Sequence, residues 1–354
     1  MKFKSFLLST TLLLLSLILF SNCSHSGVAG AAVKKNDSTA ATTTAQAKSA
    51  DTVIAPIVYP PVNHKLYDSL MKRLAHGDTT GRWPVKNAPY PVAGAILPFK
   101  RVVAYYGNLY SKKMGILGEL PPNEMLARLK GEVRNWEKAD PTTPVQPALH
   151  YIAVVASGDP GKDKKYRHRM PFKQIDTILY LAKKAHAIVF LDIQVSLSNI
   201  RAELPLLEKY IEMPQVHIGM DPEFSMKDGT LPGKKIGTFD ADDINYVSAY
   251  MANVVRKYHL PAKILIIHRF TRKMVTNYKN IKLHPEVQMV MNMDGWGEPD
   301  LKTGTYRNFI YPEPVQFTGF KLFYKNDIKK APHHMLTPTE VLKYKPYPIY
   351  IQYQ

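Results

Sequence analysis

Eight short apolar runs recur between residues 102 and 352, and most of them end in a charged or hydrogen-bonding residue. Stretches with helical spacing separate most of these runs. Strands that alternate with helices predict βαβ units and a parallel sheet, and eight such strands predict an α/β fold of the (β/α)8 TIM-barrel type. In that architecture the C-terminal strand ends form the active-site face. The predicted strands are Val102–Tyr106, Leu149–Val155, Ala187–Asp192, Val216–Asp221, Ala262–His268, Val287–Asp294, Phe317–Phe323 and Pro348–Gln352.

The segments between these runs predict the outer helices. In residues 121–136, Met125, Leu129 and Trp136 share one apolar face, and prolines open the helix. The sequence ends just after the eighth strand, so the eighth helix is missing. We expect an amphipathic N-terminal helix at 62–76 to fill its slot against strands eight and one. The other predicted helices are 171–186, 199–213, 241–259, 271–281, 302–309 and 337–343.

The N-terminal 22 residues have the composition of an export signal. Lys2 and Lys4 precede the apolar stretch Phe6–Phe20, and small or polar residues follow it. A basic region, an apolar region and a small-residue boundary are typical of a secretory signal peptide. The apolar stretch is shorter than the ~20 residues that a membrane-spanning helix needs. We therefore predict that residues 1–22 direct export.

Cys23 is the only cysteine in the 354 residues, so a mature chain has no disulfide of its own. Leu19–Cys23 resembles a bacterial lipobox, from which Phe20 and Asn22 depart. The resemblance implies lipidation at Cys23 and a location in the bacterial cell envelope, at the outer membrane where two membranes are present. Residues 23–60 are rich in Ala, Thr, Ser and Lys, which predicts a flexible tether. Residues 61–354 are then a single barrel domain.

The chain is strongly basic, with a formal net charge of +18. Its basic residues are scattered, and Lys162–Arg169 is the densest cluster. A high positive charge is compatible with nucleic-acid binding, but export and a lipid anchor exclude nucleic acid as the expected partner. Attraction to anionic lipid headgroups or acidic polysaccharide fits an envelope protein better. The expected partners are the membrane, through the lipid on Cys23, and a glycan or other cell-envelope ligand.

Alternation within the strands predicts which side chains face the barrel lumen. Successive side chains of a strand point to opposite faces, and in a barrel one set faces the lumen and the other the helices. In the predicted strand 187–192, Val189 and Leu191 are apolar, whereas the opposite set ends in Asp192. In strand 262–268 the equivalent terminal group is His268. The lumen therefore becomes polar towards the C-terminal strand ends.

These strand ends supply the candidate site. Its carboxylates are the candidate catalytic residues, and its other polar and aromatic side chains are candidates for binding substrate. The candidate catalytic residues are Glu223, Asp221, Asp294 and Asp192. The candidate substrate-binding residues are Tyr106, Asn108, Gln194, His268, Arg269, Trp296, Lys321 and Gln352.

Paired carboxyls predict glycoside hydrolysis as the leading chemistry. That reaction needs one protonated carboxyl as acid and one carboxylate as base or nucleophile. Crowding of acids raises the pKa of one of them, and Glu223 beside Asp221 is the best candidate for the proton donor. Asp294 or Asp192 is its expected partner. Trp296 is an expected aromatic platform for a sugar ring. This chemistry requires no cofactor.

Two short segments resemble the family-18 chitinase-like glycoside hydrolases. Gly219–Glu223 is similar to the Asp-x-Glu end of that family's fourth strand, and Met293–Asp294 is similar to the Tyr-Asp of its sixth strand. The resemblance implies a barrel in which Glu223 is the acid and Asp221 orients the substrate. Pro222 and Met293 stand where the family has aromatic residues, and the upstream aspartates of its longer motif are absent.

Two other functions remain open. A metal-dependent phosphodiesterase-type hydrolase would use a divalent cation held by the hard oxygen and nitrogen ligands at the rim. Arg269, Lys321 and Lys162–Arg169 would then hold phosphate. The ligands of that cation would be Asp192, Asp221, Glu223, Asp294 and His268. The second alternative is a tethered barrel that binds a glycan or cell-wall component without turnover.

The region from Arg101 to Gln354 also resembles a group of uncharacterised bacterial exported proteins and lipoproteins with a barrel domain. The similar phrases are Arg101–Asn108, Met220–Met226, His268–Thr271 and Tyr350–Gln354. This resemblance implies export and a common barrel, and it leaves the chemistry open.

Overall fold

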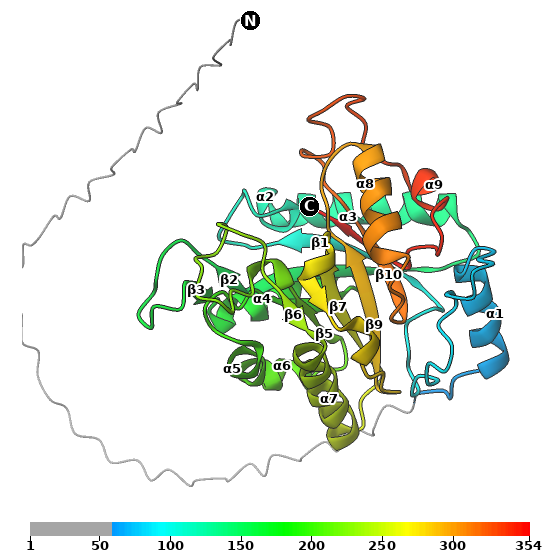
Figure 1. The fold of residues 1–354 in the computed structure, drawn as a ribbon, viewed down its shortest axis with the longest axis horizontal. Coiled ribbons are helices and arrows are strands. Elements are labelled where there is room, and N and C mark those ends of the chain that lie inside the picture. The colour runs from blue at the N-terminus through cyan, green and yellow to red at the C-terminus, as the bar shows by residue number, and fades with distance from the viewer. Residues whose placement is uncertain (1–58) are drawn as a thin grey trace, which may run out of the picture. The chain divides into compact units, whose positions relative to one another are not determined.

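A computed structural model describes residues 59–354, and these residues form a closed parallel barrel (Figure 1). The strand order is β1-β11-β10-β9-β7-β5-β4-β2, and the pairing of β1 with β2 closes the ring. The predicted (β/α)8 architecture is confirmed, with all eight strands near their predicted positions. The barrel strands are β1 Arg101–Gly107, β2 Val145–Ala156, β4 Ile188–Ile193, β5 Val216–Met220, β7 Lys263–Arg269, β9 Val287–Met293, β10 Phe317–Leu322 and β11 Tyr350–Tyr353.

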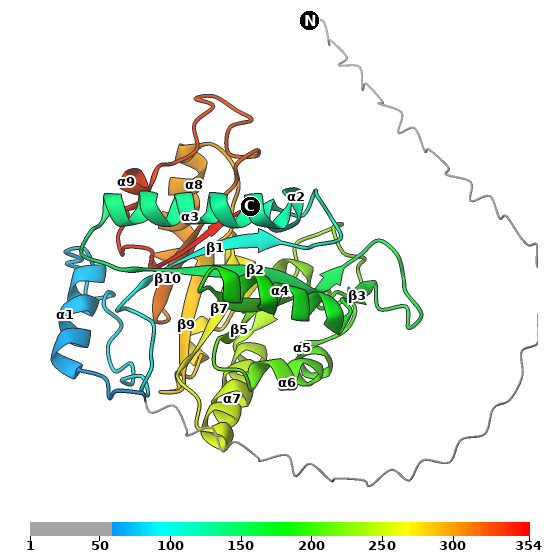
Figure 2. The ribbon, with the colours of Figure 1, turned by 180° about the vertical axis from the view of Figure 1, so that it is seen from behind.

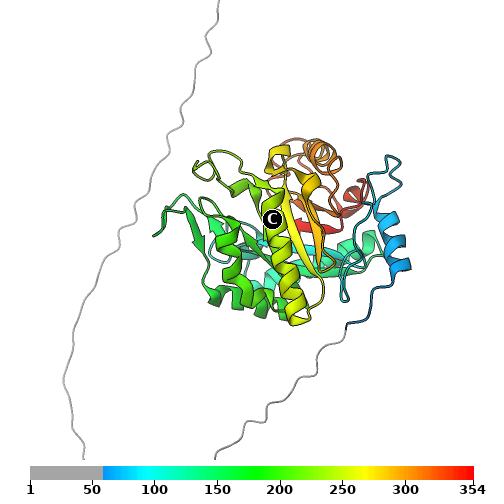
Figure 3. The same ribbon diagram turned by 60° about the horizontal axis from the view of Figure 1, so that its bottom comes forward.

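Helices cover the outside of this ring (Figure 3). A short strand, β3 (Arg167–Arg169), adds antiparallel to β2. A second small sheet pairs β6 (Phe239–Asp240) with β8 (Val275–Thr276). The helices are α1 His64–Leu74, α2 Ile116–Glu119, α3 Pro122–Ala139, α4 Phe172–Lys184, α5 Ile200–Glu203, α6 Glu208–Ile211, α7 Ala241–Tyr258, α8 Pro299–Thr305 and α9 Pro338–Val341.

Local sequence accounts for most of these helices. The long helix α7 begins with a capping box, in which Asp240 accepts a hydrogen bond from the N–H of Asp242 and Asp243 accepts one from the N–H of Asp240. Such reciprocal caps satisfy backbone donors that have no partner inside the helix. A proline near the first turn opens α3 and α8, where its missing N–H costs nothing.

Two predicted helices differ in the structure. Residues 199–213 are not continuous, because Pro205 lies in a 3-10 turn between α5 and α6 and cannot donate a helical hydrogen bond. The prediction of a helix at 271–281 is wrong. That segment contains two 3-10 turns around β8, whose β-branched Val275 and Thr276 favour extended backbone. Asn277 then adopts a left-handed conformation, with φ of 56°, which stops any continuation.

The first helix covers the N-terminal mouth of the barrel and does not run along its side. In Figure 2, α1 lies at the end where β1 begins, opposite the arrowhead of β1. Tyr67 and Met71 of α1 join the cluster of lumen side chains that includes Phe317, and the carbonyl of Leu74 accepts from the N–H of Tyr347, just before β11. It thus lies near strands eight and one as predicted, but it seals the barrel floor.

No helix follows β11 within residues 59–354, and other elements cover the outer face of this strand. The indole Nε1 of Trp136 in α3 donates to the hydroxyl of Tyr353 at 3.0 Å, and Val341 of α9 belongs to the same buried cluster. Apolar side chains therefore form two cores, one between strands and helices and one inside the lumen. Val189 and Leu191 lie in the outer core and Phe190 in the lumen, as the alternation predicts.

The N-terminal predictions concern residues outside this description. The predicted signal peptide, the predicted lipidation of Cys23 and nearly all of the predicted tether lie outside the described residues 59–354. Within that range no helix is long and apolar enough to cross a bilayer.

Candidate functional site

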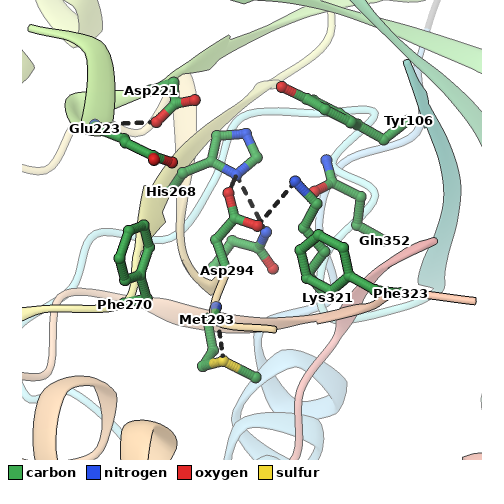
Figure 4. A network of polar contacts seen from close by, with 12 residues as sticks. Tyr106, Asp221, Glu223, His268, Phe270, Met293, Asp294, Lys321, Phe323 and Gln352 are labelled. Atoms are coloured by element: carbon green, nitrogen blue, oxygen red, sulfur yellow. Dashed lines mark hydrogen bonds and ion pairs between the residues drawn. The ribbon is translucent and has the colours of Figure 1, made fainter. Parts of the chain in front are cut away.

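A cavity of about 540 Å³ opens at the C-terminal ends of the barrel strands. Its size lies within the range usual for small-molecule sites, about 300–1,000 Å³. Polar side chains form one part of its lining and aromatic side chains another (Figure 4). The polar and charged groups include Tyr106, Gln194, Asp221, Glu223, Asp294 and Lys321, and the aromatic groups include Phe224, Phe270, Trp296, Phe309 and Phe323.

A tight turn after β5 presents Glu223 to this cavity. The strand ends at Met220, and Pro222–Phe224 form a 3-10 turn capped by Asp221. The Oδ1 atom of Asp221 accepts from the N–H of Glu223 at 3.0 Å, and Gln194 donates to its Oδ2 at 3.2 Å. Proline at the first position of the turn stops the strand, because it has no N–H for the ladder. The backbone of Glu223 is therefore fixed at the rim, and the residue lines the cavity.

A chain of ion pairs runs beside the cavity. His268 Nδ1 lies 2.9 Å from Asp294 Oδ2, and Lys321 Nζ lies 2.8 Å from Asp294 Oδ1. On the other side of the imidazole, His268 Nε2 lies 3.4 Å from Asp192 Oδ1. The ammonium of Lys321 also sits 3.9 Å from the centre of the Tyr106 ring. Four strands thus contribute alternating negative and positive groups to one buried row.

These neighbours set the charges in the row. Burial would lower the pKa of His268, but Asp192 and Asp294 outweigh it and raise that pKa to about 10. Burial would raise the pKa of Asp294, but Lys321 and His268 outweigh it and lower that pKa. The pKa of Asp192 is likewise lowered, because the charge of His268 and the contacts of both histidines exceed the effect of burial. The two aspartates are therefore carboxylates at neutral pH.

Glu223 and Asp221 have the opposite tendency. Burial, followed by the negative charge of Asp294, raises the pKa of Glu223 to about 7, although Lys321 and His268 oppose the shift. Burial is also the main reason that the pKa of Asp221 lies well above its usual range. The cavity therefore contains a carboxyl that holds a proton near neutral pH and, in Asp294, a carboxylate that does not. Separation of pKa values between carboxyls is what acid/base chemistry requires.

A second polar layer lies directly below. His150 is fully buried, and its Nδ1 lies 2.6 Å from the hydroxyl of Tyr350, to which Gln352 also donates. The hydroxyl of Tyr106 donates to Asp192 Oδ2 at 3.0 Å and so connects this layer to the cavity lining. Burial lowers the pKa of His150 to about 4, so its imidazole is neutral.

The structure separates the predicted site residues into three groups. Glu223, Asp221, Asp294, Tyr106, Gln194, Trp296 and Lys321 line the cavity. Asp192, His268 and Gln352 lie in the buried layer beneath it, each with no exposed surface. Asn108 and Arg269 do not line the cavity.

Asn108 and Arg269, which do not line the cavity, form hydrogen bonds with backbone groups. Asn108 donates to the carbonyl of Ile152 at 3.0 Å and accepts from the N–H of Tyr110. Arg269 follows His268 on β7, so its side chain points to the opposite face, where it pairs with Glu313 and donates to the carbonyl of Arg272 at 3.0 Å. Arg269 therefore anchors the loop after β7.

Two residues of the buried layer, His150 and Tyr350, are not in the site predicted from the sequence. Both residues occupy lumen-facing positions of their strands, so alternation could have placed them in the site.

The predicted site also lacks Phe270, Phe309 and Phe323, which add aromatic lining to the cavity. Phe270 follows the end of β7 and Phe309 lies in the helical turn Tyr306–Ile310, where strand alternation gives no direction. Phe323 shares the parity of Lys321, which was the available signal.

No family model matches the chain, and no curated protein matches it in sequence. Among solved structures, "Cellulase Cel5C_n" is 12% identical, with a TM-score of 0.36. The matched region is 62% of this chain and 65% of that chain. A mutant form of Thermotoga maritima Cel5A in complex with cellobiose is 12% identical with a TM-score of 0.39, covering 72% of this chain and 88% of that one. The barrel itself is defined by the strand pairing described above, and the chemistry of the site follows from the residues of this chain.

Proposed function

We propose that this barrel is a glycoside hydrolase-like enzyme in which Glu223 is the general acid and Asp294 is the base or nucleophile. The observation that carries the proposal is one cavity with two carboxyls held in different states. Glu223 lies at the rim with a pKa of about 7. Asp294 is fixed by Lys321 and His268. Both glycosidase mechanisms need this pairing of a protonated and an ionised carboxyl.

The division of labour follows from the contacts. No ion pair among residues 59–354 ties up the carboxyl of Glu223, so it is available to deliver a proton to a glycosidic oxygen. Asp294 accepts two cationic partners, which keep it ionised and fix its orientation. A carboxylate held in this way can stabilise the positive charge that develops on the sugar ring, either by direct attack or by activating water.

The aromatic part of the lining suits a sugar substrate. Trp296 is half exposed at the cavity, and Phe270 and Phe323 also line it. The apolar faces of sugar rings pack against such side chains, while Glu223 and Gln194 give the same cavity polar groups. Concave sites with mostly apolar walls and a few polar groups are typical for small ligands. This combination supports a glycan as the substrate class.

Replacement of Glu223 tests the proposal most directly. Glu223→Gln should lower turnover of a responsive glycan or aryl glycoside by roughly 10²–10⁴-fold, the usual contribution of a general acid. Binding of the same ligand should persist, because the amide keeps the shape of the side chain. The measurement is initial rate across a panel of chromogenic glycosides and envelope polysaccharides, with binding followed by calorimetry.

Glu137→Gln is the matched control, because Glu137 is exposed on α3, outside the cavity. It should retain wild-type rates. Unchanged turnover in Glu223→Gln would sink the assignment. Saturable glycan binding with no turnover by the wild-type chain would instead favour a binding protein.

The same proposal places the enzyme at the bacterial cell envelope, with a lipid on Cys23 as its membrane anchor and an envelope glycan as its partner. The lipobox-like segment supports this location. Cys23→Ser should move the protein from the membrane fraction to the soluble fraction and abolish incorporation of labelled fatty acid. Retention of both in the variant would contradict the anchor.

A further inference from the structure

Three nitrogen and oxygen atoms that can bind metal converge in the layer below the cavity. His150 Nε2 lies 3.3 Å from Asp192 Oδ1, and His268 Nε2 lies 3.4 Å from the same oxygen. All three atoms lie within 4.8 Å of one another. Each residue has no exposed surface, and none of the three atoms makes a hydrogen bond within the described residues 59–354. Buried polar atoms without partners are rare and indicate a bound ion or water or a functional role.

The remaining polar atoms of the same three side chains are all occupied. Asp294 pairs with His268 Nδ1 at 2.9 Å. The hydroxyl of Tyr350 lies 2.6 Å from His150 Nδ1, and the hydroxyl of Tyr106 donates to Asp192 Oδ2. Metal-binding histidines are usually held in this way, with the outer nitrogen bonded to a carboxylate or another oxygen and the inner nitrogen directed at the ion.

Gly219 keeps the space between these atoms open. It pairs with Asp192 across β4 and β5. A Cβ atom at Gly219 would lie 2.4 Å from Asp192 Oδ1 and 2.4 Å from His150 Nε2. Any other residue there would therefore fill the space that the carboxylate and the imidazole face.

We propose that His150, Asp192 and His268 bind a divalent first-row transition-metal cation, of which Zn²⁺ is representative. Bonds of about 2.0–2.2 Å at tetrahedral or octahedral angles separate neighbouring ligand atoms by about 3.0–3.5 Å, and the observed separations of 3.3 and 3.4 Å lie in that range. Charge-assisted N–H···O bonds are shorter, about 2.7–2.9 Å. Two imidazoles with one carboxylate favour such a cation over Mg²⁺ or Ca²⁺, which prefer all-oxygen sites.

This site differs from the metal site considered from the sequence. The earlier ligand set included Asp221, Glu223 and Asp294. Here Asp294 is not a ligand but contacts the outer nitrogen of His268, and both proposed glycosidase carboxyls, Glu223 and Asp294, remain outside the ligand set. Because Tyr106 binds Asp192 and also lines the cavity, the cation would brace the cavity floor. The role is therefore separate from the proton transfer proposed for Glu223, and it is tested without an activity assay.

The test uses the full-length chain, stripped of metal with a chelator and titrated with Co²⁺ as a visible-absorption probe. We expect one equivalent to give d–d bands, Zn²⁺ to displace it, and the melting temperature to rise, since a ligand that binds only the native state stabilises it. Absence of both the bands and the rise would overturn the proposal. It would leave His268 as a proton-bearing imidazolium between two carboxylates.

Variants locate the binding. Asp192→Asn keeps the side-chain shape and should weaken Co²⁺ affinity at least tenfold. Tyr350→Phe removes only the partner of His150 Nδ1 and should weaken it by about 10–100-fold, the usual cost of losing an outer-shell partner. If Asp192→Asn fails to fold, Tyr350→Phe decides alone.

His334→Gln is the control, because His334 forms a surface pair with Glu340 that an adventitious cation could use. It should bind as the wild type does. Wild-type affinity in a folded Asp192→Asn, or in Tyr350→Phe where that variant decides, would overturn the proposal. So would loss of the Co²⁺ bands in His334→Gln.

Discussion

The lower and upper halves of the lumen are equally buried but chemically different. Phe190 and Ile266 in the lower half and Asp192 and His268 in the upper half all have no exposed surface. Phe190 and Asp192 lie two residues apart on β4, so both face the lumen. Ile266 and His268 have the same relation on β7. The same strands therefore supply a hydrophobic floor and a polar site, with burial unable to distinguish them.

This difference separates a lower half of the lumen that stabilises the fold from an upper half whose buried charges cost stability. The floor is mostly apolar, its buried Gln288 is hydrogen-bonded to the backbone of Leu97, and α1 seals it from below. The upper layer buries carboxylates and cations, which is costly unless every group is paired. Barrels usually place function at the C-terminal face and stability at the N-terminal face. The two halves of this lumen follow that division.

The largest effect expected in the floor is a loss of stability. Ile266→Ala should lower the free energy of unfolding by about 2–5 kcal/mol, because it deletes buried methyl groups and leaves a cavity among rigid strands. Urea denaturation followed by circular dichroism measures this change.

Ile236→Ala is the matched control, since Ile236 is 43% exposed. It should change stability by less than about 0.5 kcal/mol. Similar losses in both variants would break the comparison, because the floor would then contribute no more than the surface does.

A smaller and reversible effect is expected in the upper half, where protonation controls function. Glu223 must hold its proton to act as an acid, and its pKa is raised to about 7 by burial and by Asp294, against Lys321 and His268. Activity should therefore be full below that pH and fall about tenfold per unit above it. Because the pKa of Asp294 is lowered, Asp294 stays ionised and activity should not fall as the pH drops below neutrality.

The measurement is the pH profile of kcat/KM, which reports the groups of the free enzyme. Circular dichroism at each pH separates this effect from unfolding. A profile that stays flat from pH 5 to 9 would contradict the role of Glu223. A fall on the acid side near neutrality would mean that Glu223 acts as a base.

The order and facing of the strands could be predicted because they depend on local periodicity. Alternation in β4 and β7 is enough to place Asp192 and His268 in the lumen. The failed helix at 271–281 shows the limit of that reasoning, since β8 forms by pairing with β6, more than thirty residues earlier. The position of α1 could not be predicted from local periodicity either, because it depends on which barrel surface remains uncovered.

The sequence alone determined the barrel, its lumen-facing set and the polar character of one end, because a period of two is written in consecutive residues. Only the tertiary structure decided that Glu223 reaches the cavity while Asp192 is sealed below it. It also decided their charges. His268 stands between carboxylates from two other strands, and such through-space neighbours set each pKa. Their distances arise only when the ring of strands closes.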